Sequence, residues 1–266
     1  MAIDEHERVS RPSRRKAVKT RAVANAGYRK GKETRERILD AALAAFGEAS
    51  FKAVTTRRIS QAAGVSLPTL QYYFGDKEGL YRACAEAIVE RYRRHTRGAG
   101  AEAAQALKEH CASAMARVHL KALIGALAGF LVGSKEAQRW AQFVARELRD
   151  PGPAFEILYE NLWRPGVEIT ARLIARILGS PESDPAGRIQ ALLLISSLLA
   201  FQSGRSISLR TMHWSTIGRE ELALVLTGIH AQIDAIGLYP DDGKAKPRAL
   251  ARPAVRPRRP PGPPRR

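Results

Sequence analysis

The sequence predicts an all-α protein, and three observations support this fold class. From about residue 32 to residue 236, apolar side chains recur at intervals of three and four, the spacing that places them on one face of a helix. Glycine and proline separate these periodic segments, and no segment shows the alternating pattern of a half-buried strand. Hydrophobic residues make up 45% of the chain, which is enough to fill the cores of one or two domains.

Four helices are expected first, and the second and third of them are short. The earliest starts near Lys32, carries an apolar stripe and ends near Gly47. Thr56, Ser66 and Asp76 are suited to cap the next three, because a short polar side chain can accept a hydrogen bond from a free N–H of the first turn. Longer helices are expected over residues 102–118, 120–132, 135–149, 154–178, 186–204 and 216–236.

Charge and composition divide the chain into four parts. The formal charge is +18, but residues 1–32 carry ten Lys/Arg against three Asp/Glu, and residues 241–266 carry nine against two. The first stretch has little periodic apolar content, and the proline density of the second forbids a helix. The expected parts are a basic flexible arm (1–31), a three-helix domain (32–95), a larger helical domain (96–240) and a disordered Arg/Pro-rich tail (241–266).

The segment from Thr55 to Phe74 has the layout of a helix-turn-helix. A first helix is followed by Gly64, which supplies a left-handed turn, by the apolar Val65, and by a second helix with Pro68 in its first turn. In such a motif the second helix enters the major groove of DNA. Its exposed face offers hydroxyl, amide and aromatic groups for phosphates and base edges. Any compact three-helix unit also needs caps, a glycine and aromatic side chains, so the layout alone leaves DNA binding open.

The stretch from Lys32 to Ile88 resembles the DNA-binding domain of the tetracycline-repressor (TetR) family. The likeness rests on three ordered matches, from Arg35 to Phe46, from Thr55 to Ser66 and from Thr69 to Leu80. It implies a homodimer with an all-helical ligand-binding and dimerisation domain, which represses transcription until a small-molecule effector binds. The resemblance implies DNA contacts from Thr55, Thr56, Arg57, Leu67, Pro68, Thr69, Gln71, Tyr72, Tyr73 and Lys77.

Helix 135–149 is the expected wall of an effector site. Its candidate residues are Trp140, Phe143, Arg146 and Glu147. Trp140, Phe143 and Glu147 follow one another at intervals of three and four residues, and Arg146 is next to Glu147. They would form an aromatic wall with one charged pair that orients a polar group on a mostly apolar ligand. The alternative is an amphipathic helix that packs its aromatic side chains into the core, while the charged pair bonds internally or to solvent. The run that starts at Arg139, within about 120–215, also resembles the CecR-like branch of the TetR family.

The last two expected helices, 186–204 and 216–236, predict a dimer. Their apolar faces are wider than packing within one chain requires, so a four-helix bundle across a two-fold axis is expected, with a single buried helix pair as the alternative. A dimer would place two recognition helices about 34–36 Å apart and require a near-palindromic DNA operator.

The sequence offers no pattern for catalysis, metal binding or membrane insertion. It has no Gly-rich phosphate loop, no Gly-x-Ser-x-Gly elbow and no metal-ligand spacing of histidines, so neither an enzyme nor a bound cofactor is expected. Without a signal peptide or an apolar run of about 18 residues, a cytoplasmic protein with no membrane partner is expected. The remaining alternative is a non-sequence-specific DNA-coating protein that acts through its basic tails, because Lys and Arg release counterions from any duplex.

Overall fold

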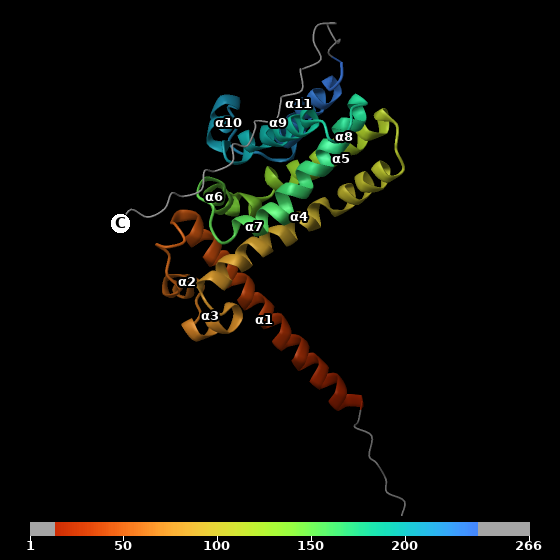
Figure 1. The fold of residues 1–266 in the computed structure, drawn as a ribbon. Helices are drawn as coiled ribbons and strands as arrows, with labels where there is room; N and C mark the ends of the chain where they lie inside the picture. The colour runs from red at the N-terminus through yellow and green to blue at the C-terminus, as the bar shows by residue number, and fades with distance from the viewer. Residues whose placement is uncertain (1–13, 239–266) are drawn as a thin grey trace, which may run out of the picture.

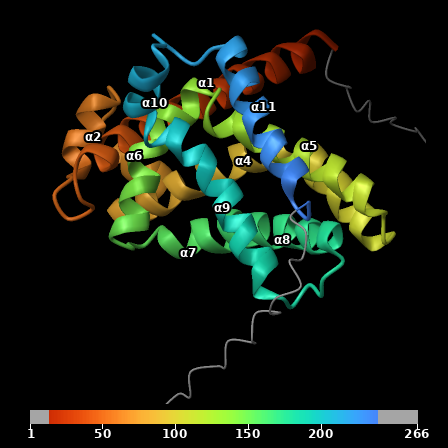
Figure 2. The same cartoon turned by 90° about the horizontal axis from the view of Figure 1, so that it is seen from above.

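The computed structural model describes residues 14–238, with side chains from Arg29 onward. Every element in that range is helical, which confirms the predicted all-α class. Figure 1 shows a small unit of α1, α2 and α3 beside a larger bundle, and α4 runs from one into the other. The elements are α1 (Arg14–Glu48), α2 (Thr56–Ala62), α3 (Leu67–Phe74), α4 (Lys77–Lys108), α5 (Ser113–Leu131), α6 (Lys135–Arg149), α7 (Phe155–Leu158), the π-helical turn η1 (Tyr159–Trp163), α8 (Arg164–Leu178), α9 (Pro185–Gln202), α10 (Arg205–Met212) and α11 (Arg219–Ala235). Figure 2 shows the same arrangement from above.

Side-chain caps fix where the short helices begin. Ser66 and Asp76 cap α3 and α4 as expected, each accepting a hydrogen bond from the backbone N–H three residues further on, at 3.2 and 2.7 Å. The expected cap at Thr56 is wrong, because Thr55 caps α2 and accepts a hydrogen bond from the Arg58 N–H at 3.2 Å. The two threonines are chemically identical, so only the backbone decides between them. Thr55 has the extended conformation that a cap requires, with φ −111° and ψ 145°.

Helix α1 begins at Arg14, well before the start expected near Lys32, so residues 14–31 are helical and do not form the flexible arm predicted for them. The physical reason is that Ala, Lys and Arg are strong helix formers. A helix already nucleated by packing can propagate through such residues without an apolar stripe of its own. Figure 1 shows this part of α1 projecting away from the bundle. Residues 1–13 of the predicted arm and the predicted tail 241–266 lie outside the described residues.

Three helices of the larger bundle differ from the expected pattern. Helix α4 continues through Gly98 and Gly100, where a break was expected, because buried side chains on both sides, including Thr96 and Ala103, pack it against the bundle. That packing outweighs the roughly 1 kcal/mol that each glycine costs in a helix interior. Helix α5 is continuous where two helices were expected. Helix α10 was not expected, since it contains no buried residue and so leaves no apolar stripe in the sequence.

The predicted helix 154–178 contains a π-helical turn. The Arg164 N–H bonds to the Tyr159 carbonyl, five residues back, directly before Pro165. Proline has no N–H to donate, so the ladder is already interrupted at this point and a wider turn costs little. The path continues as α8 up to Gly179, whose φ of +66° ends the helix in the left-handed conformation.

Two hydrophobic cores hold the molecule together. The first joins the α1–α3 unit and the start of α4 to α6 and α7, and it contains Phe46, Tyr81, Phe143 and Leu158. The second lies inside the larger bundle, between α4, α5, α8, α9 and α11. The first core therefore includes side chains from both sides of the boundary predicted at residues 95 and 96. The small unit and α6 therefore form one packed body.

Helix α5 is long and apolar enough to span a membrane by length and composition, although no such run was expected from the sequence. The bent pair of α9 and α10 passes the same test together, across a bend of 74°. The apolar character of α5 has a structural explanation in this fold. Its buried side chains, including Leu120 and Ile124, pack in the second core against α4, α8 and α11.

Candidate nucleic-acid interface and internal cavity

Helices α2 and α3 form the predicted helix-turn-helix. Gly64 between them has a φ of +62°, as the turn requires, and Val65 packs against the first core. Ile59 of α2 and Leu70 of α3 are completely buried, so the opposite sides of both helices face outward. All ten residues predicted to contact DNA are exposed or half-buried, namely Thr55, Thr56, Arg57, Leu67, Pro68, Thr69, Gln71, Tyr72, Tyr73 and Lys77.

The exposed face of α3 is preorganised. The hydroxyls of Ser66 and Thr69 lie 2.8 Å apart and share a hydrogen bond, which holds Thr69 in one orientation. Tyr72 is 84% exposed, and its ring meets the edge of the Tyr73 ring with the centroids 5.2 Å apart. Tyr73 itself is half-buried beside α1, where a Cβ added at Gly31 would lie 3.4 Å from its hydroxyl. This part of α1 therefore lies in ordinary van der Waals range of the tyrosine and supports the recognition helix from behind.

Lys77 also has a structural role. Its ammonium lies 4.6 Å from the centroid of the Phe51 ring and donates a hydrogen bond to the Lys52 carbonyl at 3.4 Å. Both contacts tie the start of α4 to the segment before α2. Arg57 is exposed on the adjacent helix, and the next residue, Arg58, pairs with Glu48 at 2.8 Å. The surface around α3 thus carries positive charge beside its polar face, a combination suited to a phosphate backbone.

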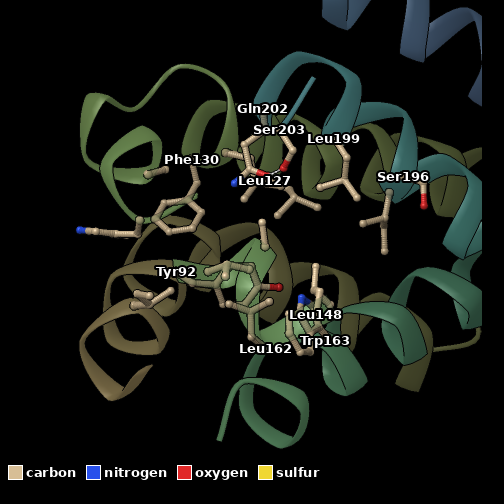
Figure 3. A pocket seen from close by; sticks show the side chains of 18 of the residues that line it. Tyr92, Leu127, Phe130, Leu148, Leu162, Trp163, Ser196, Leu199, Gln202 and Ser203 are labelled. Carbon is tan, nitrogen blue, oxygen red and sulfur yellow. Dashed lines mark hydrogen bonds between the residues drawn. The ribbon is translucent and has the colours of Figure 1, made fainter. Parts of the chain in front are cut away.

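The larger bundle contains a cavity of about 260 Å³ between α4, α5, α6, η1, α8 and α9, called here the bundle cavity. It opens to solvent, because its lining residues Leu148, Leu192 and Ser203 are exposed. Figure 3 shows Gln202 and Ser203 at one end and the Tyr92 hydroxyl pointing inward from another side. The lining residues are Ile88, Tyr92, Leu127, Phe130, Leu131, Ala137, Trp140, Val144, Ala145, Leu148, Leu162, Trp163, Gly166, Val167, Leu192, Ile195, Ser196, Leu199, Gln202 and Ser203. None of them is charged at neutral pH. Tyr92 is the one lining residue that can titrate, and burial raises the pKa of its phenol, so it stays protonated; a hydrogen bond with Thr96 opposes that rise only in part.

The four residues expected to bind an effector do not lie together. Trp140 is buried and lines the bundle cavity. Phe143 is buried in the first core instead, with its ring centroid 4.9 Å from that of Tyr81. Arg146 donates hydrogen bonds to the Gly47 and Glu48 carbonyls of α1, at 3.1 and 3.2 Å. Of the four expected residues, only Trp140 therefore lines the bundle cavity, and the expected charged pair does not face it.

Helical geometry explains this outcome. Trp140, Val144 and Leu148 are four residues apart and face the cavity, whereas Phe143 and Glu147, also four apart, face the small unit. The sequence pattern contained both stripes and gave no sign of which one faced a cavity. Leu148 was missed, although its spacing from Trp140 was available, because only the packing of α5 and α9 creates the space in front of it.

Glu147 links α6 to α4 inside the first core. Glu147 and Tyr81 are each only 1% exposed, and the Tyr81 hydroxyl donates a hydrogen bond to Glu147 Oε1. The Gly152 N–H donates to Oε2 at 3.2 Å. Burial, followed by the hydrogen bond and the negative charge of Glu147, raises the pKa of the Tyr81 phenol well above its usual value. Tyr81 therefore stays protonated and remains a donor, so the charged pair predicted for Arg146 and Glu147 is replaced by a buried bond to Tyr81.

An open helix-turn-helix joined through a shared core to a bundle with an internal cavity defines a class of transcriptional regulators that bind DNA at one end and a ligand at the other. Comparison with known proteins agrees. Residues 38–84 match the bacterial regulatory proteins of the tetR family, and residues 116–237 match the C-terminal domain of the HTH-type transcriptional dual regulator CecR.

The chain is 30% identical over 211 residues to the HTH-type transcriptional dual regulator CecR of Shigella flexneri, a match that covers 78% of this chain and 92% of that protein. It is also 30% identical over 118 residues to the transcriptional regulator BetI of Serratia proteamaculans, covering 44% and 56% of the two chains. This chain therefore belongs to the TetR family. Regulators of this family are sequence-specific DNA-binding repressors and often respond to ligands, so the alternative of a non-sequence-specific DNA-coating protein is not supported.

Solved structures agree at the level of the fold. A transcriptional regulator from Pseudomonas aeruginosa PAO1 superposes with a TM-score of 0.54 at 16% identity, covering 78% of this chain and 92% of the other. AmtR of Mycobacterium smegmatis gives 0.51 at 21% identity, covering 75% and 85%. Both are consistent with an N-terminal helix-turn-helix and a larger C-terminal helical domain.

Proposed function

We propose that this chain is a cytoplasmic homodimeric repressor that leaves its DNA operator when a small molecule enters the bundle cavity. The observation that carries the proposal is the position of α6 between the two sites. One stripe of α6 lines the cavity, and the other packs against the α1–α3 unit and α4. A ligand that displaces Trp140 or Leu148 therefore acts on the same helix that supports the DNA-binding unit.

The DNA-binding face consists of the ten residues predicted from the sequence. Tyr72, Gln71 and Thr69 reach the bases or the adjacent phosphates from α3. The exposed Arg57 and the helix starts at Thr55 and Leu67 meet the phosphate backbone, where free N–H groups and positive charge favour an anion. The full set comprises Thr55, Thr56, Arg57, Leu67, Pro68, Thr69, Gln71, Tyr72, Tyr73 and Lys77.

Dimerisation uses α9 and α11. Large apolar side chains on these helices are exposed in the isolated chain, with Leu193 at 66% and Leu224 at 61%. Ile189 and Leu192 of α9 are also more than half exposed. An apolar face of this kind is stabilised when two copies bury it against each other about a two-fold axis. The same axis would place two α3 helices one DNA turn apart, about 34–36 Å, on a near-palindromic operator.

Release requires only a modest energetic coupling. A ligand that shifts operator affinity 5- to 150-fold supplies about 1–3 kcal/mol of coupling free energy. Close packing between α1 and α6 supports transmission of a small shift. A Cβ added at Gly47 of α1 would lie 3.0 Å from Gln142 Cβ of α6, so the two helices approach more closely than a side chain at position 47 would allow without a shift. Displacement of α6 therefore moves α1 and changes the distance between the two recognition helices of the dimer.

A mobility-shift titration tests DNA recognition. The parent protein is titrated against DNA flanking its own gene at about 150 mM salt, close to physiological ionic strength, with excess non-specific competitor. We expect tight binding that competitor does not remove and at least tenfold weaker binding by Tyr72→Ala. Because Tyr72 is 84% exposed, its loss should leave the fold intact. The matched control is Tyr159→Ala, an exposed tyrosine on η1 far from α3, which should bind like the parent. Equal binding by Tyr72→Ala and the parent would contradict the proposed interface.

A further inference from the structure

The polarity of the bundle cavity restricts what it can hold. Its walls are supplied by leucine, isoleucine, valine and alanine together with four aromatic rings, those of Tyr92, Phe130, Trp140 and Trp163. Polar atoms are confined to a few places. Gln202 and Ser203, which share a hydrogen bond of 3.3 Å, form one polar end, called here the Gln202 end. Figure 3 shows this end across the cavity from Leu162 and Trp163.

Two arginines lie near the cavity without lining it. Arg91 lies behind Trp140, with its guanidinium carbon 4.8 Å from the ring centroid, and forms a 2.9 Å ion pair with Glu136. Arg205 donates a hydrogen bond to the Val132 carbonyl. Neither arginine is among the residues that line the cavity. An isolated carboxylate or ammonium that enters the apolar part of the cavity loses hydration there without gaining a charged partner, which disfavours the ion.

Size sets a second restriction. A volume of about 260 Å³ lies just below the usual range of small-molecule sites. At roughly 30 Å³ for each water molecule, it corresponds to about nine waters, which is room for a compound of one or two rings. The flat side chains of Trp140, Trp163 and Phe130 offer faces and edges against which an aromatic ring can stack or meet edge-on.

We propose that the bundle cavity binds an uncharged, one- or two-ring aromatic ligand whose single polar group bonds at the Gln202 end. This inference rests on the proposed function only in naming the ligand as an effector. The binding preference itself follows from the cavity walls. The Gln202 carboxamide and the Ser203 hydroxyl can each donate and accept, so they suit a neutral amide or hydroxyl group and provide no counter-charge for an ion.

A pair of nearly isosteric probes tests the charge preference. Naphthalene-2-carboxamide is neutral at pH 7, whereas naphthalene-2-carboxylate carries one negative charge and has nearly the same shape. Binding of each to the full-length protein is measured by isothermal titration calorimetry. We expect the amide to bind at least tenfold more tightly than the carboxylate. Equal binding of the two probes, or no binding of the amide up to its solubility limit, would overturn the proposal.

A charge introduced at the polar end should reverse this preference. Gln202 is half-buried at the C-terminal end of α9, where a cation is favoured by the helix dipole, so Gln202→Lys should fold and should bind the carboxylate at least tenfold more tightly than the parent does. The control is Gln105→Lys, an exposed position on α4 whose new ammonium can pair with Glu109. This control should keep the preference of the parent. If Gln202→Lys gains nothing for the carboxylate, the assigned polar end is wrong.

The same probes separate this inference from the proposed function. Operator binding is measured with saturating naphthalene-2-carboxamide and without it. Weakened operator binding supports both ideas. If the amide binds with the expected preference while operator affinity stays unchanged, the ligand class stands and release through this cavity is refuted. If the amide weakens operator binding but the carboxylate reaches its half-maximal effect at the same concentration as the amide, the ligand class is refuted and release stands.

Discussion

The buried bond between Tyr81 and Glu147 gives the sharpest prediction for stability. Both side chains are 1% exposed, so water cannot replace the phenol hydroxyl in Tyr81→Phe, and Glu147 would keep only the donor from Gly152 at 3.2 Å. A hydrogen bond to a charged group contributes about 1.5–3 kcal/mol, and leaving a buried acceptor short of a donor costs a similar amount. We therefore expect Tyr81→Phe to lower the free energy of unfolding by about 2 kcal/mol.

Thermal unfolding followed by circular dichroism at neutral pH checks this value. For a chain of this size, about 2 kcal/mol corresponds to a fall in Tm of about 4–8 °C. Protein concentration is held fixed, because dimerisation makes Tm depend on it. Tyr159→Phe is the matched control: this tyrosine is 41% exposed, and its Tm should change by less than about 2 °C.

A double variant tests whether the loss of stability comes from the hydrogen bond between Tyr81 and Glu147. If the loss comes from a buried carboxylate that lacks a donor, then Tyr81→Phe combined with Glu147→Leu should be more stable than Tyr81→Phe alone. The double variant removes the carboxylate, and the Gly152 N–H that it frees is only half-buried and can bond to water. A Tm for Tyr81→Phe within about 1 °C of the parent would refute the argument. So would a double variant whose losses simply add, since that result would mean that the two side chains do not interact.

Three further predictions concern the dimer, alkaline pH and the basic part of α1. Leu193→Glu places an unpaired charge on the α9 face, so light scattering at micromolar concentration should show a monomer where the parent is a dimer, and an unchanged dimer would contradict the proposed interface. The folded protein holds the pKa of Tyr81 above the unfolded value of about 10, so the stability that the protonated phenol contributes is complete below pH 10 and is lost as the pH rises beyond it. Between pH 8 and pH 11 the Tm should therefore fall less steeply for Tyr81→Phe than for the parent. Parallel plots of Tm against pH would exclude this cause. The third variant replaces the eight Lys and Arg residues between positions 14 and 32 with Gln, which should keep the helix. The slope of log affinity against log salt concentration should become shallower by about 0.9 for each DNA phosphate that is no longer neutralised. An unchanged slope would show that this part of α1 does not contact DNA.

Local chemistry determined the helix-turn-helix from the sequence alone. Ser66, Asp76 and Gly64 occupy the caps and turn predicted for them because a cap or a left-handed turn depends on one residue and its immediate neighbours. The ten predicted DNA-binding positions all lie at the surface for the same reason, since Ile59 and Leu70 fix which faces of α2 and α3 are buried. The all-α class followed from a periodicity that every helix of the core must show.

Tertiary packing decided the features that the sequence left open. Trp140 and Phe143 are both buried aromatic residues on α6, yet one lines the bundle cavity and the other fills the first core, because α9 leaves space before one stripe and α1 closes against the other. Glu147 is a charged residue whose partner, Tyr81, lies far away in the chain, so no local spacing revealed it. Amino-acid patterns specify which faces are apolar. Which apolar face meets a neighbour and which meets a cavity depends on the arrangement of all the helices together.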